Sequence, residues 1–364
     1  MKMFLVCNSL GGGGAERVHV NLANGFAQRG HEVYLVADIY KNVTYPVDEQ
    51  VHVLPLCPRT TNKLLKWVKS VSMLRKNVKK YKPDVVIGNM DLCSVISRIS
   101  TLFTSTPVVF ANHHALESQA YKIKMQTKLS DCILPRFVSA TTLLTAADKK
   151  YMARKYHQQK NIFVMPNPLT FTPVSNIPPK ENIIFAAGRL NNWRYKGWDI
   201  LINAAEKLKP LLIEKGWMIQ IAGGGTEKES EFLEVLCQQA GAGDVIEFLG
   251  YRTDMEALFQ KASIYCLSSR TEGLPMVLIE AMSQGCAPVA CENLDRTKEI
   301  ITNETEGLLF ETANIEDLVQ KLTKMIVDDE YRQKVQKCAV KRSQYYLPEN
   351  IICEWEKLFQ QILH

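Results

Sequence analysis

Two glutamates, Glu272 and Glu280, stand eight residues apart in a pattern that suits the binding of a diphosphate ester. Gly273 interrupts the chain between them, and Pro275 suits the first turn of a helix, where its missing N–H costs nothing. The residues that follow favour a helix, which Gly285 ends. This spacing places Glu272 in the loop before the helix and Glu280 about one and a half turns inside it.

The start of this predicted helix is an anion site, because its first backbone N–H groups have no partner within the helix. The site comprises Gly273, Leu274, Pro275 and Met276. A carboxylate on either side of it could hold hydroxyl groups at both ends of a bound diphosphate, which is the geometry that a nucleotide-sugar requires. The alternative is an ordinary loop and helix with two solvated glutamates.

A second candidate set is cationic and follows an apolar strand that ends near residue 188. Gly188 and Arg189 come first, and Lys196 follows seven residues later. Arginine offers a planar fork and lysine a point charge, and together they can neutralise a diphosphate. Arg194 competes with Lys196 for this role, and a solvated basic loop is the alternative. Since the sequence has no Asp-x-Asp motif to hold a metal, a diphosphate leaving group would need such protein cations.

Glycine-rich turns follow two strands, one in each half of the chain. The first turn runs from Gly11 to Gly14, and its candidate contacts are Gly12, Gly13 and Gly14. Glycines at such positions let the backbone approach a phosphate or a sugar closely. The spacing is not Gly-x-Gly-x-x-Gly, and Asp38 is only a weak candidate for a ribose ligand. The second turn contains Gly224, where a plain strand-to-helix turn is an equal alternative.

The charge of the chain is divided unevenly. The whole sequence has a net charge of +6, but residues 1–165 carry +13 and the remainder −7. A basic first half suggests an anionic partner, such as a membrane surface, a phospholipid-linked acceptor or a nucleic acid. The ten cysteines form no Cys-x-x-Cys motif, so reduced thiols in a cytoplasmic protein are expected and a zinc site is not.

The segment 63–80 is a basic amphipathic helix. Its apolar residues have helical spacing, and no acidic residue occurs between Val51 and Pro83. The stripe comprises Leu64, Trp67, Val68, Val71, Leu74 and Val78. Such a helix suits an anionic membrane surface, and a helix packed on the core with a solvated basic face is the equal alternative.

The sequence alternates short Val- and Ile-rich strands with helices in both halves, which predicts an α/β fold of two doubly wound Rossmann-like domains facing across a cleft. A proline-rich segment after Pro166 marks the boundary. The predicted domains are residues 1–167 together with a terminal helix at 348–364, and residues 168–347. No apolar run is long enough to span a bilayer, and the first residues read as a buried strand rather than a signal peptide.

Taken together, these motifs resemble retaining glycosyltransferases of family 4, which have the GT-B fold. The segment 268–282 resembles their donor-binding signature, and residues 11–17 resemble the Gly-Gly-Ala-Glu-Arg opening of bacterial glycan-assembling members. The resemblance implies that Arg189 and Lys196 hold the donor diphosphate and that Glu280 holds the ribose. It further implies that Glu272 holds the sugar hydroxyls.

The resemblance also assigns lesser roles. The loop at Gly12 to Gly14 would close over the donor phosphates, Gly224 would shape the donor pocket, and the loop with Arg252 would contact the nucleotide base. His113 would lie near the donor sugar in a positioning role and is favoured over His114. The terminal helix would cross back onto the first domain.

The function that follows is transfer of a hexose or N-acetylhexosamine from a nucleotide-sugar, with UDP as the expected nucleotide, to a glycan or lipid-linked acceptor. The mechanism would be front-face, retaining and metal-independent, with Glu272, His113, Arg189 and Lys196 as the catalytic set. No cofactor and no nucleic acid are expected, and the location would be cytoplasmic, on the inner face of the membrane. A nucleotide-sugar 2-epimerase, an NAD-dependent dehydrogenase and a non-enzymatic membrane-binding module are the alternatives.

Overall fold

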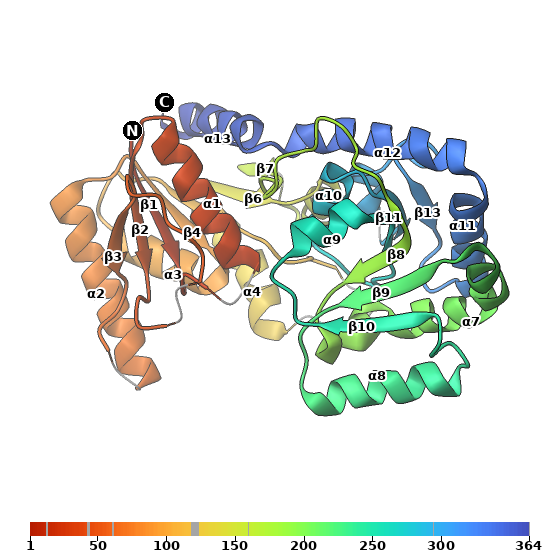
Figure 1. Ribbon diagram of the computed structural model, residues 1–364. Helices are drawn as coiled ribbons and strands as arrows, with labels where there is room; N and C mark the ends of the chain where they lie inside the picture. Colours follow the sequence, from red (N-terminus) through yellow and green to blue (C-terminus); the bar gives the residue numbers. More distant parts are fainter. Residues whose placement is uncertain are drawn as a thin grey trace. The chain divides into compact units, whose positions relative to one another are not determined.

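The computed structural model describes residues 1–11, 14–41, 44–59, 62–117, 124–158, 160–293 and 295–363. The chain divides into two compact units (Figure 1). Unit 1 comprises Met1–Glu117, Ile123–Pro168 and Tyr346–His364, and unit 2 contains Leu169–Tyr345.

Unit 1 is built on a parallel sheet with the strand order β3-β2-β1-β4-β5-β6-β7. Its strands are β1 (Lys2–Cys7), β2 (Glu32–Ala37), β3 (His52–Pro55), β4 (Val85–Asn89), β5 (Val108–Ala111), β6 (Ala140–Leu143) and β7 (Ile162–Val164). Its α-helices are α1 (Gly14–Gln28), α2 (Lys63–Tyr81), α3 (Met90–Ser100), α4 (Met125–Ile133), α5 (Ala146–Tyr156) and α13 (Pro348–Leu363).

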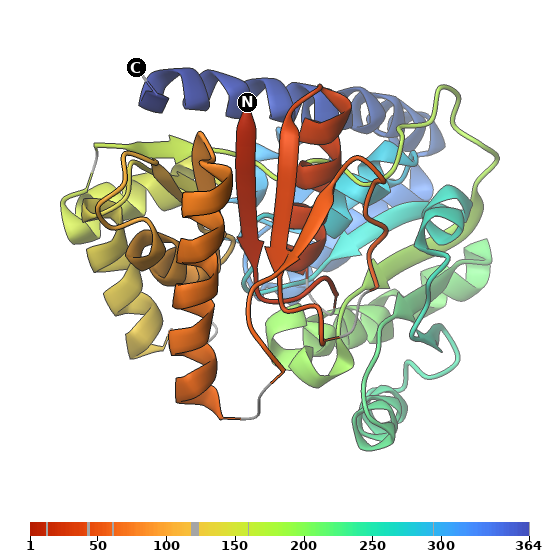
Figure 2. The ribbon, with the colours of Figure 1, turned by 90° about the vertical axis from the view of Figure 1, so that its left-hand side faces the viewer.

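The two faces of this sheet have separate cores, because side chains alternate along each strand. Met3 and Leu5 of β1 face a cluster that includes residues of α1 and α13, whereas Phe4 and Val6 face a cluster shared with α2 and α3. Figure 2 shows α1 and α2 on opposite faces of the sheet. Helix α13 therefore completes the core of unit 1, although it is the last element of the chain.

Unit 2 has a parallel sheet with the strand order β10-β9-β8-β11-β12-β13. Its strands are β8 (Glu181–Ala187), β9 (Met218–Ala222), β10 (Ile246–Gly250), β11 (Ala262–Leu267), β12 (Ala287–Cys291) and β13 (Leu308–Phe310). Its α-helices are α6 (Trp193–Lys196), α7 (Trp198–Lys215), α8 (Glu227–Gln239), α9 (Met255–Lys261), α10 (Met276–Ser283), α11 (Ile315–Val327) and α12 (Asp329–Ser343).

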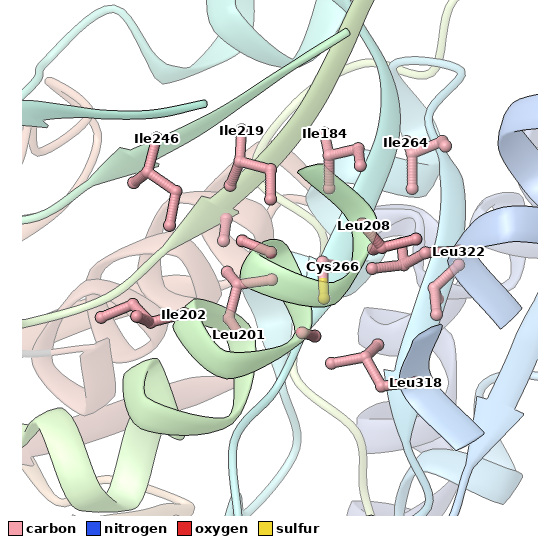
Figure 3. Close-up of a cluster of buried hydrophobic side chains, with 14 of the residues drawn as sticks. Ile184, Leu201, Ile202, Leu208, Ile219, Ile246, Ile264, Cys266, Leu318 and Leu322 are labelled. Carbon is pink, nitrogen blue, oxygen red and sulfur yellow. The ribbon is translucent and has the colours of Figure 1, made fainter. Parts of the chain in front are cut away.

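The core of unit 2 joins the sheet to the helices that cover one face. Ile184, Ile219 and Ile264 of three strands pack with Leu208 of α7 and Leu322 of α11 (Figure 3). The strand order places β8 at the centre, between β9 and β11. The loops after β8, β9 and β11 therefore meet at the carboxyl edge of one sheet, where ligands of open α/β sheets bind.

The α/β fold class with two doubly wound units is confirmed. Several elements differ from the sequence expectation. The strands β6 and β7 and the helix α4 are not predicted by the sequence pattern. Pro275 is the N-cap of α10 instead of a residue of its first turn.

Candidate functional site

The loop from Ser268 to Pro275 and the helix α10 lie at the carboxyl end of β11, as the sequence predicts. Glu280 is in the second turn of α10 and is buried, with 4% of its surface exposed. The N–H groups of Leu278 and Ile279 donate to the carbonyl of Pro275, which marks the first hydrogen bonds of the helix. The N–H groups before them have no intrahelical acceptor, so this end of α10 can receive an anion.

Lys196 and Glu272 form an ion pair in which Nζ lies 2.8 Å from Oε1. Both side chains are largely buried, with exposed fractions of 21% and 15%. The pair joins two loops that are 76 residues apart in the chain. The lysine expected to bind phosphate and the carboxylate expected to bind sugar hydroxyls are therefore in direct contact.

Backbone contacts fix the loop that carries Lys196. The hydroxyl of Ser268 donates to the carbonyl of Lys196 at 2.8 Å, and the N–H of Arg270 donates to the carbonyl of Tyr195 at 2.7 Å. Gly197 has a φ of +66°, and a Cβ there would lie 2.1 Å from the carbonyl oxygen of Ser268. Only glycine fits this close approach of the two loops.

Gly188 is placed against the aliphatic part of Lys196. A Cβ on Gly188 would lie 2.9 Å from Cδ and Cε of the lysine. The glycine therefore makes room for the lysine to reach Glu272. The competing candidate Arg194 lies elsewhere, with its guanidinium 5.4 Å from the centroid of the Trp193 ring.

A cavity of about 440 Å³ lies beside these loops at the carboxyl ends of β8, β9 and β10. It is lined by the predicted residues Gly188, Arg189, Gly224 and Arg252. Sequence reasoning missed other lining residues, namely Asn191, Tyr251 and Met255. Tyr251 follows Gly250 directly, and its largely exposed ring is a surface on which a flat group such as a nucleobase can stack. Arg252 donates two hydrogen bonds to Asp254.

Sequence reasoning also missed Tyr265, a buried residue of β11. Burial raises the pKa of its phenol well above the usual range, and the negative charges of Glu272 and Glu280 raise it further. The phenol is therefore neutral and lies within electrostatic reach of both glutamates. No motif marks this tyrosine, because an aromatic residue inside a strand is ordinarily a core residue.

His113 and His114 follow β5 in unit 1 and have opposite environments. Burial lowers the pKa of His113 to about 4, and its Nδ1 lies 3.1 Å from Oδ1 of Asn167. An amide oxygen can only accept, so Nδ1 carries the proton and Nε2 of the neutral ring is an acceptor. Among the described residues this Nε2 has no hydrogen-bond partner.

His114 lies 3.2 Å from Asp131 through Nε2. Burial alone would lower its pKa, but the hydrogen bond and charge of Asp131 raise it above the usual value. His114 is thus engaged in a charged pair, whereas His113 offers an acceptor atom. The preference for His113 stays a prediction.

The glycine turn after β1 lies mostly outside the described residues. Gly12 and Gly13 are outside the described residues, and Gly14 is the first residue of α1. Asp38 is buried and paired with Lys66, whose Nζ lies 2.5 Å from Oδ2. Because its carboxylate is already paired, Asp38 is not arranged as the ribose ligand that a dinucleotide-binding domain needs.

Among the described residues, one group of three side chains could hold a metal ion. Asp91, His114 and Asp131 each place a ligand atom within 4.8 Å of the others. All three belong to unit 1, and His114 and Asp131 already bond each other. Within the part of the chain that is described, every helix is too short or too polar to cross a membrane.

Two family models match the chain, and between them the matches run from residue 12 to residue 342. Residues 12–170 match the model described as Glycosyltransferase Family 4, and residues 170–342 match the one described as Glycosyl transferases group 1. The first lies in unit 1 and the second in unit 2.

Curated relatives align over nearly the full length. An uncharacterized glycosyltransferase of Haemophilus influenzae is 29% identical, with 97% of this chain and 98% of the relative covered. An alpha-1,4-N-acetyl-D-galactosaminyltransferase of Campylobacter jejuni, named for an undecaprenol-linked substrate, is 27% identical, with 100% and 99% covered. The amylovoran biosynthesis glycosyltransferase AmsD of Erwinia amylovora is 24% identical, with 95% of each chain covered.

Solved structures share the fold. A glycosyltransferase of Rickettsia africae superposes with a TM-score of 0.80 at 18% identity, with 100% of this chain and 98% of that chain covered. HepE of Anabaena, solved with UDP and glucose, has a TM-score of 0.79 at 18% identity, with 98% of each chain covered. The chain is therefore a glycosyltransferase of GT-B fold, built from a Glycosyltransferase Family 4 domain and a Glycosyl transferases group 1 domain.

Proposed function

We propose that this enzyme transfers a hexose or N-acetylhexosamine from a UDP-sugar to a lipid-linked glycan, with retention of configuration at the anomeric carbon. The observation that carries the proposal is the ion pair of Lys196 and Glu272 beside the start of α10 and the cavity that Arg189 lines. This arrangement brings phosphate-binding groups and a sugar-binding carboxylate together in one unit.

The donor would lie along the carboxyl edge of the unit 2 sheet. The base and ribose would occupy the cavity with Tyr251 and the region of Glu280. The diphosphate would meet Arg189, Lys196 and the N–H groups at the start of α10, whose partial positive charge adds to that of the two cations. Glu272 would accept hydrogen bonds from the sugar hydroxyls.

Lys196 has a second task in this scheme. Its ammonium group has three donors, so it can keep its bond to Glu272 while it donates to a phosphate oxygen. The ion pair then couples the position of the leaving group to that of the sugar. Such positioning supplies the effective molarity on which a front-face transfer depends.

The chemical step would exchange two bonds at the anomeric carbon on one face of the sugar. The bond to the phosphate oxygen breaks, a bond to the acceptor oxygen forms, and the acceptor proton passes to the departing phosphate. The charge that develops on the diphosphate would be stabilised by Arg189 and Lys196 without a metal ion. His113, neutral and half-buried, would accept a hydrogen bond from a substrate hydroxyl and so orient it.

The acceptor class follows from the relatives. Two Campylobacter jejuni relatives are named as N-acetylgalactosaminyltransferases with undecaprenol-linked substrates. A lipid-linked acceptor also fits the basic charge of the first half and the helix α2. That helix buries Leu74 and Val78 in the core and exposes Leu64 and Val68, so it packs on the core and still has apolar side chains available for a membrane surface. We propose peripheral attachment to an anionic membrane surface.

The test is a transfer assay with an undecaprenyl-diphosphate-linked sugar and a panel of UDP-hexoses and UDP-N-acetylhexosamines, each with and without EDTA. The proposal predicts a new α-linked sugar, identified by the anomeric coupling in the proton NMR spectrum, and a rate unchanged by EDTA. A β-linked product would reject retention, and loss of activity in EDTA would reject metal independence. Release of UDP with a free epimerised sugar and no transfer would favour a 2-epimerase.

A further inference from the structure

Helix α4 of unit 1 has its apolar residues on the outside. Met125, Leu129 and Ile133 are 78%, 56% and 42% exposed, and Phe137, four residues further on, is 60% exposed. A spacing of four residues keeps Met125, Leu129 and Ile133 on one side of α4, and Phe137 follows the 3₁₀ turn Leu134–Arg136 that ends this helix. We call these four residues the α4 stripe.

The opposite side of α4 is held to unit 1 by a charged residue. Asp131 is the one residue of α4 that is buried, and its carboxylate accepts hydrogen bonds from Asn112 and His114. A helix on the surface of a globular protein normally buries its apolar stripe and exposes its charges. Helix α4 has the reverse polarity, which is expected where the outer face meets an apolar phase.

The charges around the α4 stripe are positive. Lys124 precedes the helix and Lys128 lies within it, and both are exposed. The acidic residue of the helix, Asp131, is buried in its pair. An exposed apolar stripe flanked by lysines is the composition of a helix that lies in the interface of an anionic bilayer.

The first turns of α2 offer the same combination. Leu64, Leu65 and Val68 are exposed near the start of a helix that has no acidic residue. Helix α2 follows β3 and α4 follows β5, so both helices begin at the carboxyl edge of the sheet. Figure 2 shows α2 extending below the carboxyl ends of the strands. Two helices thus expose apolar residues and lysines at one edge of unit 1.

We propose that the α4 stripe inserts into the interfacial layer of a bilayer that contains anionic lipids, together with the first turns of α2. A second copy of the chain is a poorer occupant, because residues 1–165 carry a net charge of +13 and would repel each other. This inference rests on the proposed use of a lipid-linked acceptor, because that acceptor is the reason for the enzyme to bind a membrane. The surface itself is identified from the exposure and charge of its residues.

The test is co-sedimentation of the purified enzyme with vesicles that contain phosphatidylglycerol and with vesicles of phosphatidylcholine alone. The variant M125S/L129S removes half of the stripe and touches no core residue, so its melting temperature should equal that of the wild type. It should bind the anionic vesicles at least about tenfold more weakly, since each buried apolar side chain contributes roughly tenfold. The matched control is I213S/V327S, which removes two exposed apolar side chains of unit 2 and should bind as the wild type does.

A charge variant separates the two contributions. K124Q/K128Q should weaken binding to the anionic vesicles and reduce its dependence on salt, while the wild type should bind phosphatidylcholine poorly. Equal binding by M125S/L129S and the wild type would overturn the proposal. So would a wild-type dimer that this variant converts to a monomer, which would make the stripe a contact between copies.

UDP binding, measured on the same samples, distinguishes a failure of the proposed membrane surface from a failure of the proposed UDP-sugar donor. UDP binding by every variant, together with vesicle binding that M125S/L129S loses, supports the membrane surface. Vesicle binding without UDP binding would leave the surface intact and reject the proposed donor.

Discussion

At the scale of single residues, the proposed donor site depends on charged groups whose partners are already in place. Lys196 and Glu272 contact each other, and Glu280 is buried in α10 within electrostatic reach of Tyr265. Carboxylates held in this way need little reorganisation to accept hydroxyl groups. This preorganisation is what a site for transition-state charge requires.

The role of Glu280 can be tested with the isostere E280Q. If the carboxylate accepts hydrogen bonds from the ribose, its loss should cost about 1.5–3 kcal/mol of UDP binding, or roughly ten- to a hundredfold in Kd. Calorimetric titration with UDP measures this, and the melting temperature reports the fold. The control is E214Q, which changes an exposed glutamate of α7 and should bind UDP normally. Unchanged affinity in E280Q would remove Glu280 from the ribose site.

Arg189 should matter more for turnover than for the fold. It lines the cavity at the carboxyl end of β8, where the departing diphosphate would lie. R189A should cut turnover about a hundredfold or more, because it removes a cation from the place where charge develops. Steady-state transfer rates at saturating donor give the result. The control K207A removes a lysine that pairs with Glu316 on the surface, and wild-type rates in R189A would refute the diphosphate assignment.

At the scale of elements, the shape of the site is set by turns that have no space for a side chain. A Cβ on Gly223 would lie 1.8 Å from the carbonyl oxygen of Gly188, which is a backbone atom and has no freedom to move aside. The turns after β8 and β9 are therefore packed directly against each other. Gly14 is the opposite case, since a Cβ there meets nothing within 4 Å.

This contrast gives a paired prediction. G223A should destabilise the protein by about 2 kcal/mol or more and weaken UDP binding, because it forces two turns of the cavity apart. G14A should leave stability unchanged or raise it by up to about 1 kcal/mol. Urea unfolding of both variants measures the difference. A G223A protein as stable as the wild type would contradict the close packing of the turns.

Much of unit 2 could be predicted from its sequence, because its signals are local. Gly223 to Gly225 mark a turn after a strand, and the pattern from Glu272 to Glu280 marks a loop and a helix. Helix α4 could not be predicted in this way. The usual signal of a surface helix is an apolar stripe that packs on the core, but the stripe of α4 faces outward, and the residue it buries is Asp131.

Other features depended on tertiary context. The strands β6 and β7 are four and three residues long, too short for a periodic pattern to stand out. The cavity residues Tyr251 and Met255 and the buried phenol of Tyr265 come from separate elements. Only the order of strands in the sheet brings these elements together, and no single segment of the sequence determines that order.

At the scale of the whole molecule, the last helix, α13, stabilises unit 1. Helix α13 packs on α1, where Trp355 and Phe359 meet the ring of Phe26. At the surface of this contact Glu356 receives two hydrogen bonds from Arg29 and lies 2.9 Å from Nε2 of His31. The fold of unit 1 therefore depends on both ends of the chain.

This contact makes a pH prediction. The hydrogen bond and charge of Arg29 hold the pKa of Glu356 below its usual value near 4.5. A carboxyl group with a lowered pKa stabilises the fold above its unfolded pKa and loses that contribution as the pH falls through its folded pKa. E356Q should therefore melt at a lower temperature than the wild type at pH 7, and the gap should narrow as the pH falls below the usual pKa of a glutamate and through the lowered pKa of Glu356. A gap independent of pH would show that the charge of Glu356 contributes nothing.

Unit 2 is proposed to hold a nucleoside diphosphate with protein cations alone. Calorimetric titration of the full chain with UDP, GDP and NAD, each with and without EDTA, measures this binding. UDP should bind in the micromolar range with and without EDTA, GDP should bind more weakly, and NAD should not bind. Absence of nucleoside-diphosphate binding, its loss in EDTA, or a preference for NAD would contradict the proposal.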